Sequence, residues 1–288
     1  MAILRVENLT YTYNPNTPFS KDALKNVSFS AEKGEIIGII GHTGSGKSTL
    51  VQHLNGLLRA TDGKIFYNGN DIWENPKDIR KIRSKIGLVF QYPEHQLFDE
   101  TVYKDIAFGP KNMGLSDDEV DVSVKVSARN VGLPFEYLNK SPFDLSGGEK
   151  RRVAIAGVLA MSPEIIVFDE PTAGLDPQGR AMVFDIIKNY RKENNATVFV
   201  VSHSMEDIAQ ISDKIMVLNN GEIVMFDTPK RVFAMQETLE QIGLDVPQIT
   251  HIVHGLIKKG FNLPKDIITV DEAVAAIKKL QKGGGNVD

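Results

Sequence analysis

The sequence contains no cysteine, so it has no disulfide framework, no thiolate metal site and no cysteine nucleophile. It also has no excess of positive charge: 33 Lys and Arg residues stand against 37 Asp and Glu residues, for a formal net charge of −4. A chain with this balance has no overall electrostatic field for holding nucleic acid. We therefore expect no nucleic-acid partner.

Long hydrophobic runs are missing as well. No stretch approaches the ~18 consecutive apolar residues that cross a bilayer. The first ten residues include Arg5 and Glu7, where a signal peptide would be continuously apolar. We expect any role at a membrane to be peripheral.

The composition is that of an ordinary globular protein, with 288 residues, 42% hydrophobic and 24% charged. With roughly 150 residues per domain as a guide, the length allows one large domain and a small appendage. Short runs rich in β-branched and aromatic residues predict antiparallel strands at residues 3–13, 23–30 and 64–72. Four runs that are almost wholly apolar predict strands of a parallel sheet buried on both faces, at residues 36–40, 86–90, 165–168 and 197–201.

Helices are predicted between these strands. After Lys47, the spacing of apolar residues predicts one helix face formed by Leu50, Val51, Leu54, Leu57 and Leu58. The dipeptide Asn220-Gly221 predicts a hairpin. Near the C-terminus, Thr269-x-x-Glu272 is a capping box ahead of a further helix.

Residues 41–48, GHTGSGKS, match the phosphate-binding pattern G-x-x-x-x-G-K-[ST] between a buried strand and an amphipathic helix. Its glycines let backbone N–H groups face phosphates, and the helix N-terminus and a lysine add positive charge. The serine hydroxyl is a ligand for Mg²⁺. We expect ATP to bind along Gly41, His42, Thr43, Gly44, Ser45, Gly46, Lys47, Ser48 and Thr49.

Two acids, Asp169 and Glu170, end the buried strand 165–168. Burying carboxylates costs several kcal/mol unless a cation compensates, so acids at the tip of a parallel strand indicate a metal and its chemistry. We expect Asp169 to orient Mg²⁺ and Glu170 to act as the general base for the attacking water.

Residues 145–149, LSGGE, carry a capping box formed by Ser146 and Glu149. The Ser146 hydroxyl and the bare backbone at Gly148 also make a second anion site at a helix N-terminus. One chain then has two phosphate-binding surfaces for one nucleotide. A head-to-tail dimer resolves this, with Ser146 of one chain closing on the γ-phosphate held by Lys47 of its partner.

With these motifs, residues 3 to about 233 closely resemble the ATP-binding cassette ATPases. The resemblance implies an α/β fold, the P-loop NTPase cassette, with a mostly parallel sheet core, an N-terminal antiparallel β subdomain, a helical signature subdomain at about 92–160 and a small C-terminal helical extension. It implies that Gln91 is the Q-loop glutamine, a catalytic residue and Mg²⁺ ligand. Residues 173–176 resemble the D-loop, and His203 resembles the catalytic switch histidine.

Two positions need separate comment. Tyr13 matches the aromatic residue that stacks on adenine in this family, and Tyr11 is the competing candidate. Glu149 stands where the family more often has Gln. A carboxylate suits the helix N-terminus, but it places negative charge near phosphate, so we expect slower turnover.

The stretch from Gln91 to Pro110 is similar to the energy-coupling factor importers of cobalt and vitamins, and most like the second of their two ATPases. It places apolar surface at Tyr92, Pro93, Leu97 and Phe98 beside the Q-loop. Acid comes from Glu94, Asp99 and Glu100, and such a groove suits an amphipathic helix that carries arginine. The partners implied are a homologous ATPase, a membrane coupling subunit docked at this groove and a separate membrane substrate-binding subunit.

The expected domains are a cassette at residues 1–234, a C-terminal helical dimerisation extension at 235–282 and a disordered tail at 283–288. The implied location is the cytoplasmic face of the cell membrane. Two alternatives are an ATPase of another cassette transporter and a soluble cassette ATPase outside transport. Chromosome-maintenance ATPases are disfavoured, because the stretch between Lys47 and Ser146 is too short for a long coiled coil. Ribosome-associated cassette proteins have two cassettes per chain, and no Asn-Lys-x-Asp string indicates a GTPase.

Overall fold

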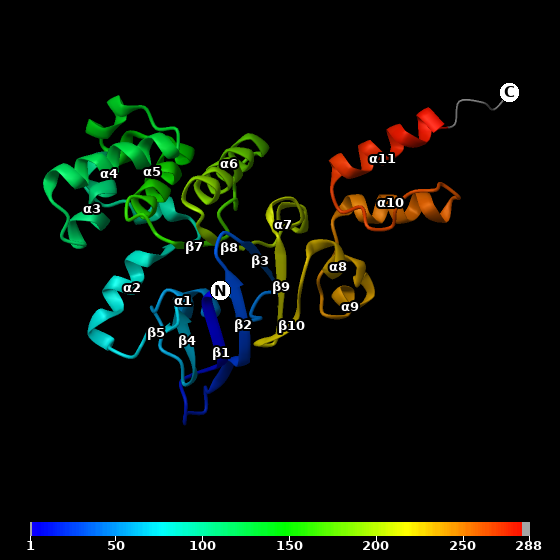
Figure 1. The fold of residues 1–288 in the computed structure, drawn as a ribbon, viewed down its shortest axis with the longest axis horizontal. Helices are drawn as coiled ribbons and strands as arrows, with labels where there is room; N and C mark the ends of the chain where they lie inside the picture. The colour runs from blue at the N-terminus through cyan, green and yellow to red at the C-terminus, as the bar shows by residue number, and fades with distance from the viewer. Residues whose placement is uncertain (1, 284–288) are drawn as a thin grey trace.

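The computed structural model describes residues 2–283. Two sheets form the centre of the molecule, and helices flank them on both sides (Figure 1). Among the described residues, no helix is long and apolar enough to cross a membrane. Of the expected tail at 283–288, Gly283 ends helix α11 and residues 284–288 lie outside the described residues.

The smaller sheet is antiparallel, as predicted, and has the strand order β2-β1-β4-β5. Its strands are β1 (Ala2–Tyr13), β2 (Lys21–Glu32), β4 (Asp62–Tyr67) and β5 (Asn70–Asp71). The β1–β2 hairpin pairs Tyr13 with Lys21 at its turn, where the loop 14–20 joins the two strands. These two residues therefore lie next to each other at the base of that loop.

The larger sheet has the strand order β10-β9-β3-β8-β7-β6, and every pair except β10–β9 is parallel. Its strands are β3 (Ile36–Ile40), β6 (Ile86–Val89), β7 (Ile165–Asp169), β8 (Thr197–Val201), β9 (Lys214–Asn219) and β10 (Glu222–Asp227). All four apolar runs are thus strands of one sheet, as predicted. Alternate residues face opposite cores: Ile36 and Ile40 pack in one cluster, and Ile37 and Ile39 in the other.

The parallel pairing fixes where chemistry can occur. Strands β3, β8, β7 and β6 are neighbours in that order and run in one direction, so their carboxyl ends meet at one edge of the sheet. Loops at that edge are where ligands bind in open α/β sheets. Residues 41–46, 91–96, 169–176 and 202–204 all follow these strand ends.

Helix α1 (Lys47–Leu54) is shorter than the apolar spacing predicted. Asn55 caps it, and Gly56 follows with φ 70°, a left-handed conformation that ends a helix at little cost to glycine. Leu57 and Leu58 therefore lie outside the helix. The Asn220-Gly221 hairpin is confirmed, with φ 49° and 86° between β9 and β10.

A helical unit lies on one side of the sheets (left in Figure 1) and includes the predicted signature helix. It contains α3 (Val102–Asn112), α4 (Asp117–Asn130) and α5 (Gly147–Leu159), with short 3₁₀ turns at Pro93–Gln96, Phe135–Asn139 and Pro142–Asp144. Helices α2 (Ile79–Lys85), α6 (Pro177–Asn194) and α7 (Met205–Ile211) complete the cassette. Both α4 and α5 begin with a full capping box.

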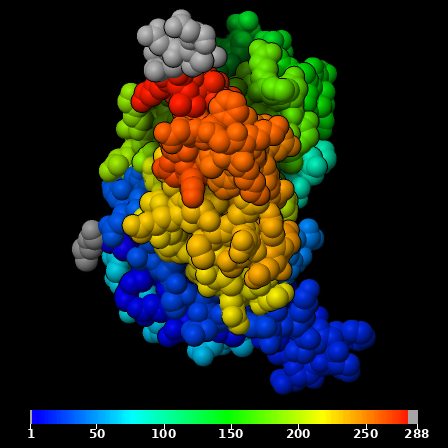
Figure 2. Space-filling view, turned by 90° about the vertical axis from the view of Figure 1, so that its right-hand side faces the viewer, coloured from blue at the N-terminus to red at the C-terminus, as the bar shows by residue number. Residues whose placement is uncertain are grey.

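The C-terminal residues form a separate helical extension on the opposite side, which faces the viewer in gold and orange in Figure 2. Helix α8 (Pro229–Ala234) packs against β9 and β10, and the extension after it contains α9 (Gln236–Gln241), α10 (Gln248–Lys258) and α11 (Val270–Gly283). Val253, Leu263, Ile267 and Ala273 form a small core of its own. The expected cap of α11 is present: Glu272 N–H donates to Thr269 Oγ1 over 3.3 Å, and the Glu272 carboxylate accepts from Ile268 N–H over 3.0 Å.

Candidate functional site

The glycine-rich loop between β3 and α1 needs its glycines. Gly44 and Gly46 have φ 83° and 107°, which side chains with a Cβ atom rarely adopt. A Cβ on Gly46 would lie 2.5 Å from the carbonyl oxygen of Ala23, so no larger residue fits. The β9–β10 hairpin braces the loop, because Gly221 N–H donates to Ser45 O over 3.0 Å. The buried Ser45 Oγ has no hydrogen-bond partner within the protein. A ligand bound in the loop would supply one.

Lys47 lies across this loop and is buried. Its ammonium group donates to the carbonyl oxygens of Gly41 at 2.7 Å and His42 at 3.1 Å. Burial lowers the pKa of Lys47, while the negative charges of Glu170 and Asp169 raise it. An anion in the loop would give the ammonium a stronger partner than two neutral carbonyls.

Asp169 ends β7 beside the loop. Burial raises the pKa of its carboxyl group, and a hydrogen bond from the Ser48 hydroxyl, with the positive charge of Lys47, lowers it. Mg²⁺ is bound in proteins by oxygen ligands of this kind, a carboxylate and a hydroxyl group side by side, while the phosphates of the substrate supply further ligands. The donor set therefore fits this ion.

Glu170 has an unusual backbone and an unusual carboxyl group. Its φ is 53°, held by a hydrogen bond from its N–H to Val201 O over 3.0 Å. Burial raises the pKa of Glu170 to about 7, although a hydrogen bond from the His203 backbone opposes the shift. Its Oε1 atom is buried and accepts no hydrogen bond. Left-handed backbone in a glutamate is strained, and such strain concentrates at functional sites.

His203 follows β8 and its ring is half exposed. Burial and the positive charge of Lys47 lower the pKa of His203. Its Nε2 atom lies 3.4 Å from Oε1 of Glu170. Strand pairing explains the contact, since Asp169 of β7 pairs with Val201 of β8. The structure thus brings Lys47, Ser48, Asp169, Glu170 and His203 together, as predicted from the sequence.

Tyr13 lines a cleft of about 160 Å³ with Gly44, Gly46, Lys47, Ser48 and Thr49. Its hydroxyl lies 3.2 Å from Oγ1 of Thr49, and its ring is 37% exposed. Tyr11 instead packs edge-on against His53 at 4.6 Å. Tyr13 is therefore the aromatic residue available to a ligand in the cleft.

Lys21 also lines this cleft, and the sequence motifs did not identify it. The signal that could have found it is its place opposite Tyr13 at the end of a predicted hairpin.

Ser146 is the N-cap of α5, and Glu149 completes the capping box. The Ser146 hydroxyl donates to Glu149 Oε2 over 2.7 Å, and Ser146 N–H donates to the same oxygen over 2.8 Å. These hydrogen bonds lower the pKa of Glu149. Neither Ser146 nor Gly148 lines the Lys47 cleft.

Gln91 follows β6 and is exposed at the edge of the larger sheet where the carboxyl ends of β3, β8, β7 and β6 meet, which we call the catalytic edge. Beyond it, a groove of about 740 Å³ runs between the sheet and the helical unit. Leu97 and Phe98 line this groove together with Leu57, Phe108 and Met113.

The remaining residues of the predicted docking stretch have other positions. Pro93 is buried, and Tyr92 stacks on His95 with ring centroids 5.9 Å apart. Neither lines the groove.

The acids near the groove also differ from expectation. Glu94 forms an ion pair with Arg151 over 2.6 Å, and Glu100 forms one with Lys104. The acid that lines the groove is Asp105, which is 9% exposed. Its Oδ1 accepts from the backbone of Phe98 and Asp99, its Oδ2 has no partner, and burial raises its pKa.

Known proteins resemble this chain over most of its length. The model of the ABC transporter family matches residues 24–173. The energy-coupling factor transporter ATP-binding protein EcfA2 of Caldanaerobacter subterraneus is 52% identical over 284 residues, covering 99% of each chain. The structure of cbiO1 from Clostridium perfringens, described as part of the ABC transporter complex cbiONQ, is 38% identical, has a TM-score of 0.75 and covers 88% of this chain and 99% of that one. A dimeric ATP-binding cassette bound to ADP and Pi is 29% identical, has a TM-score of 0.71 and covers 78% of this chain and 98% of that one.

Proposed function

The chain belongs to the ABC transporter ATPases and, within them, to the energy-coupling factor transporter ATP-binding proteins, and on this premise we propose that it drives an importer of a vitamin or a transition metal ion. As a member of this family it binds ATP and hydrolyses it. Its work is to convert each hydrolysis into movement of a membrane partner.

The observation that carries the catalytic assignment is the meeting of Lys47, Asp169 and Glu170 at one sheet edge. Lys47 exchanges its two carbonyl partners for the β- and γ-phosphates. The unpartnered Oε1 of Glu170 accepts a proton from the water that attacks the γ-phosphorus. His203, 3.4 Å from that oxygen, and Gln91 at the same edge orient the water and the phosphate.

Mg²⁺ is held by Ser48, Asp169 and Gln91 in this proposal. When bound, it neutralises charge that develops on the transferred phosphoryl group. The loop residues Gly41 to Thr49 bind the phosphates through backbone N–H groups, and Tyr13 stacks on the adenine ring.

The active unit is a head-to-tail pair with a homologous ATPase. Ser146 and Gly148 of one subunit close on the nucleotide held by Lys47 of the other. This arrangement accounts for the observation that Ser146 does not line the Lys47 cleft of its own chain. The helical extension at 235–282 holds the pair together, and its exposed apolar residues Ile252, Val270 and Val274 support that role.

The groove beside Gln91 receives an amphipathic helix of the membrane coupling subunit. Leu97 and Phe98 supply the apolar wall. Asp105 supplies a buried carboxylate oxygen without a partner, which an arginine of the incoming helix would satisfy. The subunit therefore works as a peripheral protein on the cytoplasmic face of the membrane, and a separate membrane protein binds the cargo.

Purification of this chain from native membranes tests the proposal. We expect a second ATPase, a coupling subunit and a substrate-binding membrane protein to co-purify with it, and ATP hydrolysis to accompany uptake in proteoliposomes. Recovery of the chain alone, or with ribosomes or DNA, would overturn the transport function.

A further inference from the structure

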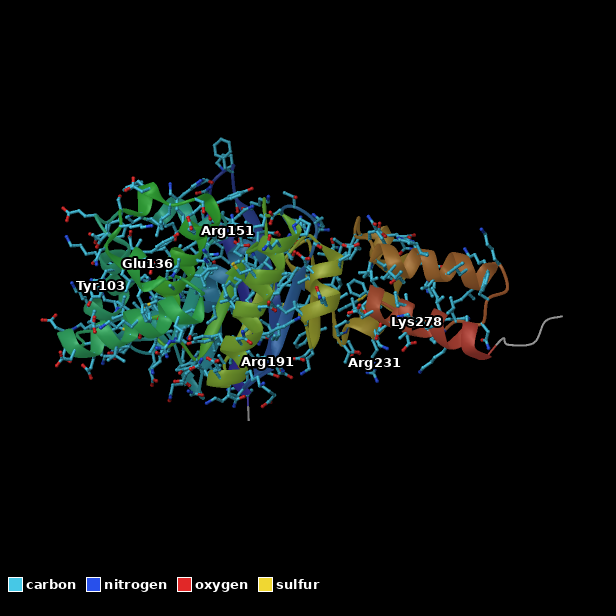
Figure 3. The ribbon with its side chains drawn as sticks, turned by 90° about the horizontal axis from the view of Figure 1, so that it is seen from above. Tyr103, Glu136, Arg151, Arg191, Arg231 and Lys278 are labelled. Carbon is cyan, nitrogen blue, oxygen red and sulfur yellow. The ribbon has the colours of Figure 1, made fainter. Side chains whose placement is uncertain are left out.

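Arg151, in the first turns of α5, is 4% exposed, and all three nitrogen atoms of its guanidinium group donate hydrogen bonds. Nε and Nη2 donate to the two carboxylate oxygens of Glu94 at 2.9 and 2.6 Å. Nη1 donates to the carbonyl oxygens of Pro171 at 3.2 Å and Ala173 at 2.8 Å. One side chain from the signature helix thus connects two loops that come from different strands, and Figure 3 labels it.

The first of these loops joins the catalytic edge to the docking groove. Glu94 lies between Gln91 and the groove residues Leu97 and Phe98, but it does not line the groove itself. The 3₁₀ turn Pro93–Gln96 makes this segment compact. Gln96 of the same turn lines the groove, so a shift of the groove wall would reach the Glu94 carboxylate, whose ion-pair partner is Arg151.

The second loop begins directly after the proposed base. Pro171 follows Glu170, whose φ of 53° requires the neighbouring backbone to be held in place. Arg151 holds this loop from one side. Asp207 of α7 holds it from the other, because Thr172 Oγ1 donates to Asp207 Oδ2 over 3.0 Å between two buried side chains.

We infer that Arg151 is a positioning residue that transmits movement of the docking groove, through Glu94, to the loop after Glu170. The inference rests on the proposed function, because it assumes that a membrane partner moves the groove. Besides its carboxylate partner, a buried arginine needs acceptors for its remaining N–H groups, and for Arg151 two of these acceptors come from the loop after Glu170. These two carbonyl groups, of Pro171 and Ala173, lie within three residues of Glu170. Their hydrogen bonds therefore connect the Glu94–Arg151 ion pair to the catalytic edge.

Arg191 provides a control with the same kinds of partners, in a more exposed pair whose side chains are 36% and 41% accessible. It also pairs with a carboxylate, Asp213, at 2.8 Å and donates to a backbone carbonyl, that of Gly34, at 2.6 Å. Neither partner lies near the groove or the catalytic edge, and Arg191 lies on the opposite side of the ribbon from Arg151 in Figure 3. Loss of an arginine–carboxylate pair as such is therefore tested by Arg191→Lys and Asp213→Asn.

The first experiment measures amide hydrogen exchange in the full-length chain. Glu94→Gln keeps the shape of the side chain and removes its charge. We expect exchange in the loop 172–176 to rise roughly threefold or more, although the side-chain hydrogen bonds of Glu94 go to Arg151 and not to that loop. The Asp213→Asn control leaves exchange in this loop unchanged. If the amide variant fails to fold, Glu94→Asp, which keeps the charge and shortens the reach, gives the same direction.

The second experiment uses the complex purified with its membrane partner. The readout is the ATPase rate of the complex divided by the rate of the ATPase pair without that partner. We expect this ratio to fall about two- to thirtyfold in Glu94→Gln and Arg151→Lys, the range found for residues that carry coupling between sites. The double variant should be no worse than Arg151→Lys, because both changes break one connection.

Three results would overturn the inference. The ratio could be unchanged in both variants, the two effects could add, or the Arg191→Lys control could lower the ratio equally. A wild-type complex whose ATPase rate does not respond to the membrane partner would refute the proposed function itself, and the inference with it.

Discussion

The Nε2 atom of His203 lies 3.4 Å from Oε1 of Glu170, the carboxylate oxygen that has no hydrogen-bond partner. The two residues are far apart in the sequence and meet because β7 and β8 are adjacent parallel strands. The contact places a proton acceptor and an imidazole at the edge where Lys47 holds its loop closed. The predictions below follow from that arrangement and from the surfaces around it.

Lys47→Ala should lower ATP affinity by roughly 100-fold or more, since charged hydrogen bonds to phosphate contribute about 1.5–3 kcal/mol each. Transport should be lost with it. Titration of purified protein with ATP measures the effect, and Lys33→Ala, which removes an exposed lysine away from the cleft, is the control. Undiminished affinity in Lys47→Ala would contradict the site.

Glu149→Gln should leave the fold intact and change the ATPase rate by no more than about tenfold, because a neutral amide can still cap α5. The direction expected is an increase, since the substitution removes a negative charge near the partner's nucleotide. Steady-state ATPase assays and thermal unfolding provide the measurements. Loss of cooperative unfolding would show that the hydrogen bonds between Glu149 and Ser146 hold the helical unit together.

Leu97→Asp combined with Phe98→Asp should release the subunit from the membrane complex while the isolated chain still binds ATP. Burying two charges at an interface costs several kcal/mol there and little elsewhere. Val122→Asp is a matched control, because Val122 and Phe98 are 60% and 62% exposed but lie on different surfaces. Asp105→Asn should weaken the complex in the same way. Full retention of the double variant in the complex would remove the docking assignment.

The Glu94–Arg151 pair predicts how stability depends on pH. Burial opposes ionisation of Glu94, but the hydrogen bonds and the charge of Arg151, together with a backbone hydrogen bond and the charge of His95, outweigh it and hold the pKa of Glu94 below its usual value. The stabilisation is therefore present above the unfolded pKa and is lost as the pH falls through the folded pKa.

Breaking a buried pair costs about 3–5 kcal/mol, and the retained amide of Glu94→Gln should place its loss in the unfolding free energy at the lower end at pH 7. This difference from the wild type should shrink as the pH falls through the lowered pKa of Glu94, because the wild-type carboxylate then becomes protonated as well. Denaturant unfolding across this range measures it. A difference that does not change with pH would mean that the charge of Glu94 contributes nothing.

The sequence predicted most of the strands, because they depend on local patterns, but the run 64–72 is divided by a turn into β4 and β5. β3 and β8 have the predicted bounds, and the Lys47 loop and Asp169 follow from motif and strand context. Leu57 was placed on a helix because its spacing fits, but the left-handed Gly56 ends α1 before it. The acid of the groove was also missed, because Glu94 pairs with an arginine 57 residues later, and no local pattern reveals such a contact. Asp105 can be identified as the acid of the groove only from the fold, which places it in the groove with no hydrogen-bond partner for Oδ2.

The central claim is that two subunits close on ATP and that Glu170 ends the closed state by hydrolysis. Glu170→Gln keeps shape and hydrogen-bonding reach but removes the proton acceptor, so hydrolysis should fall by about 10²–10⁴ while ATP still binds. Sedimentation of this variant with its partner ATPase, with and without ATP, is the most direct measurement. We predict an ATP-stabilised dimer that Ser146→Arg abolishes. A Glu170→Gln protein that hydrolyses ATP at the normal rate would remove Glu170 from the mechanism, and an inactive one that never dimerises would refute the closed pair.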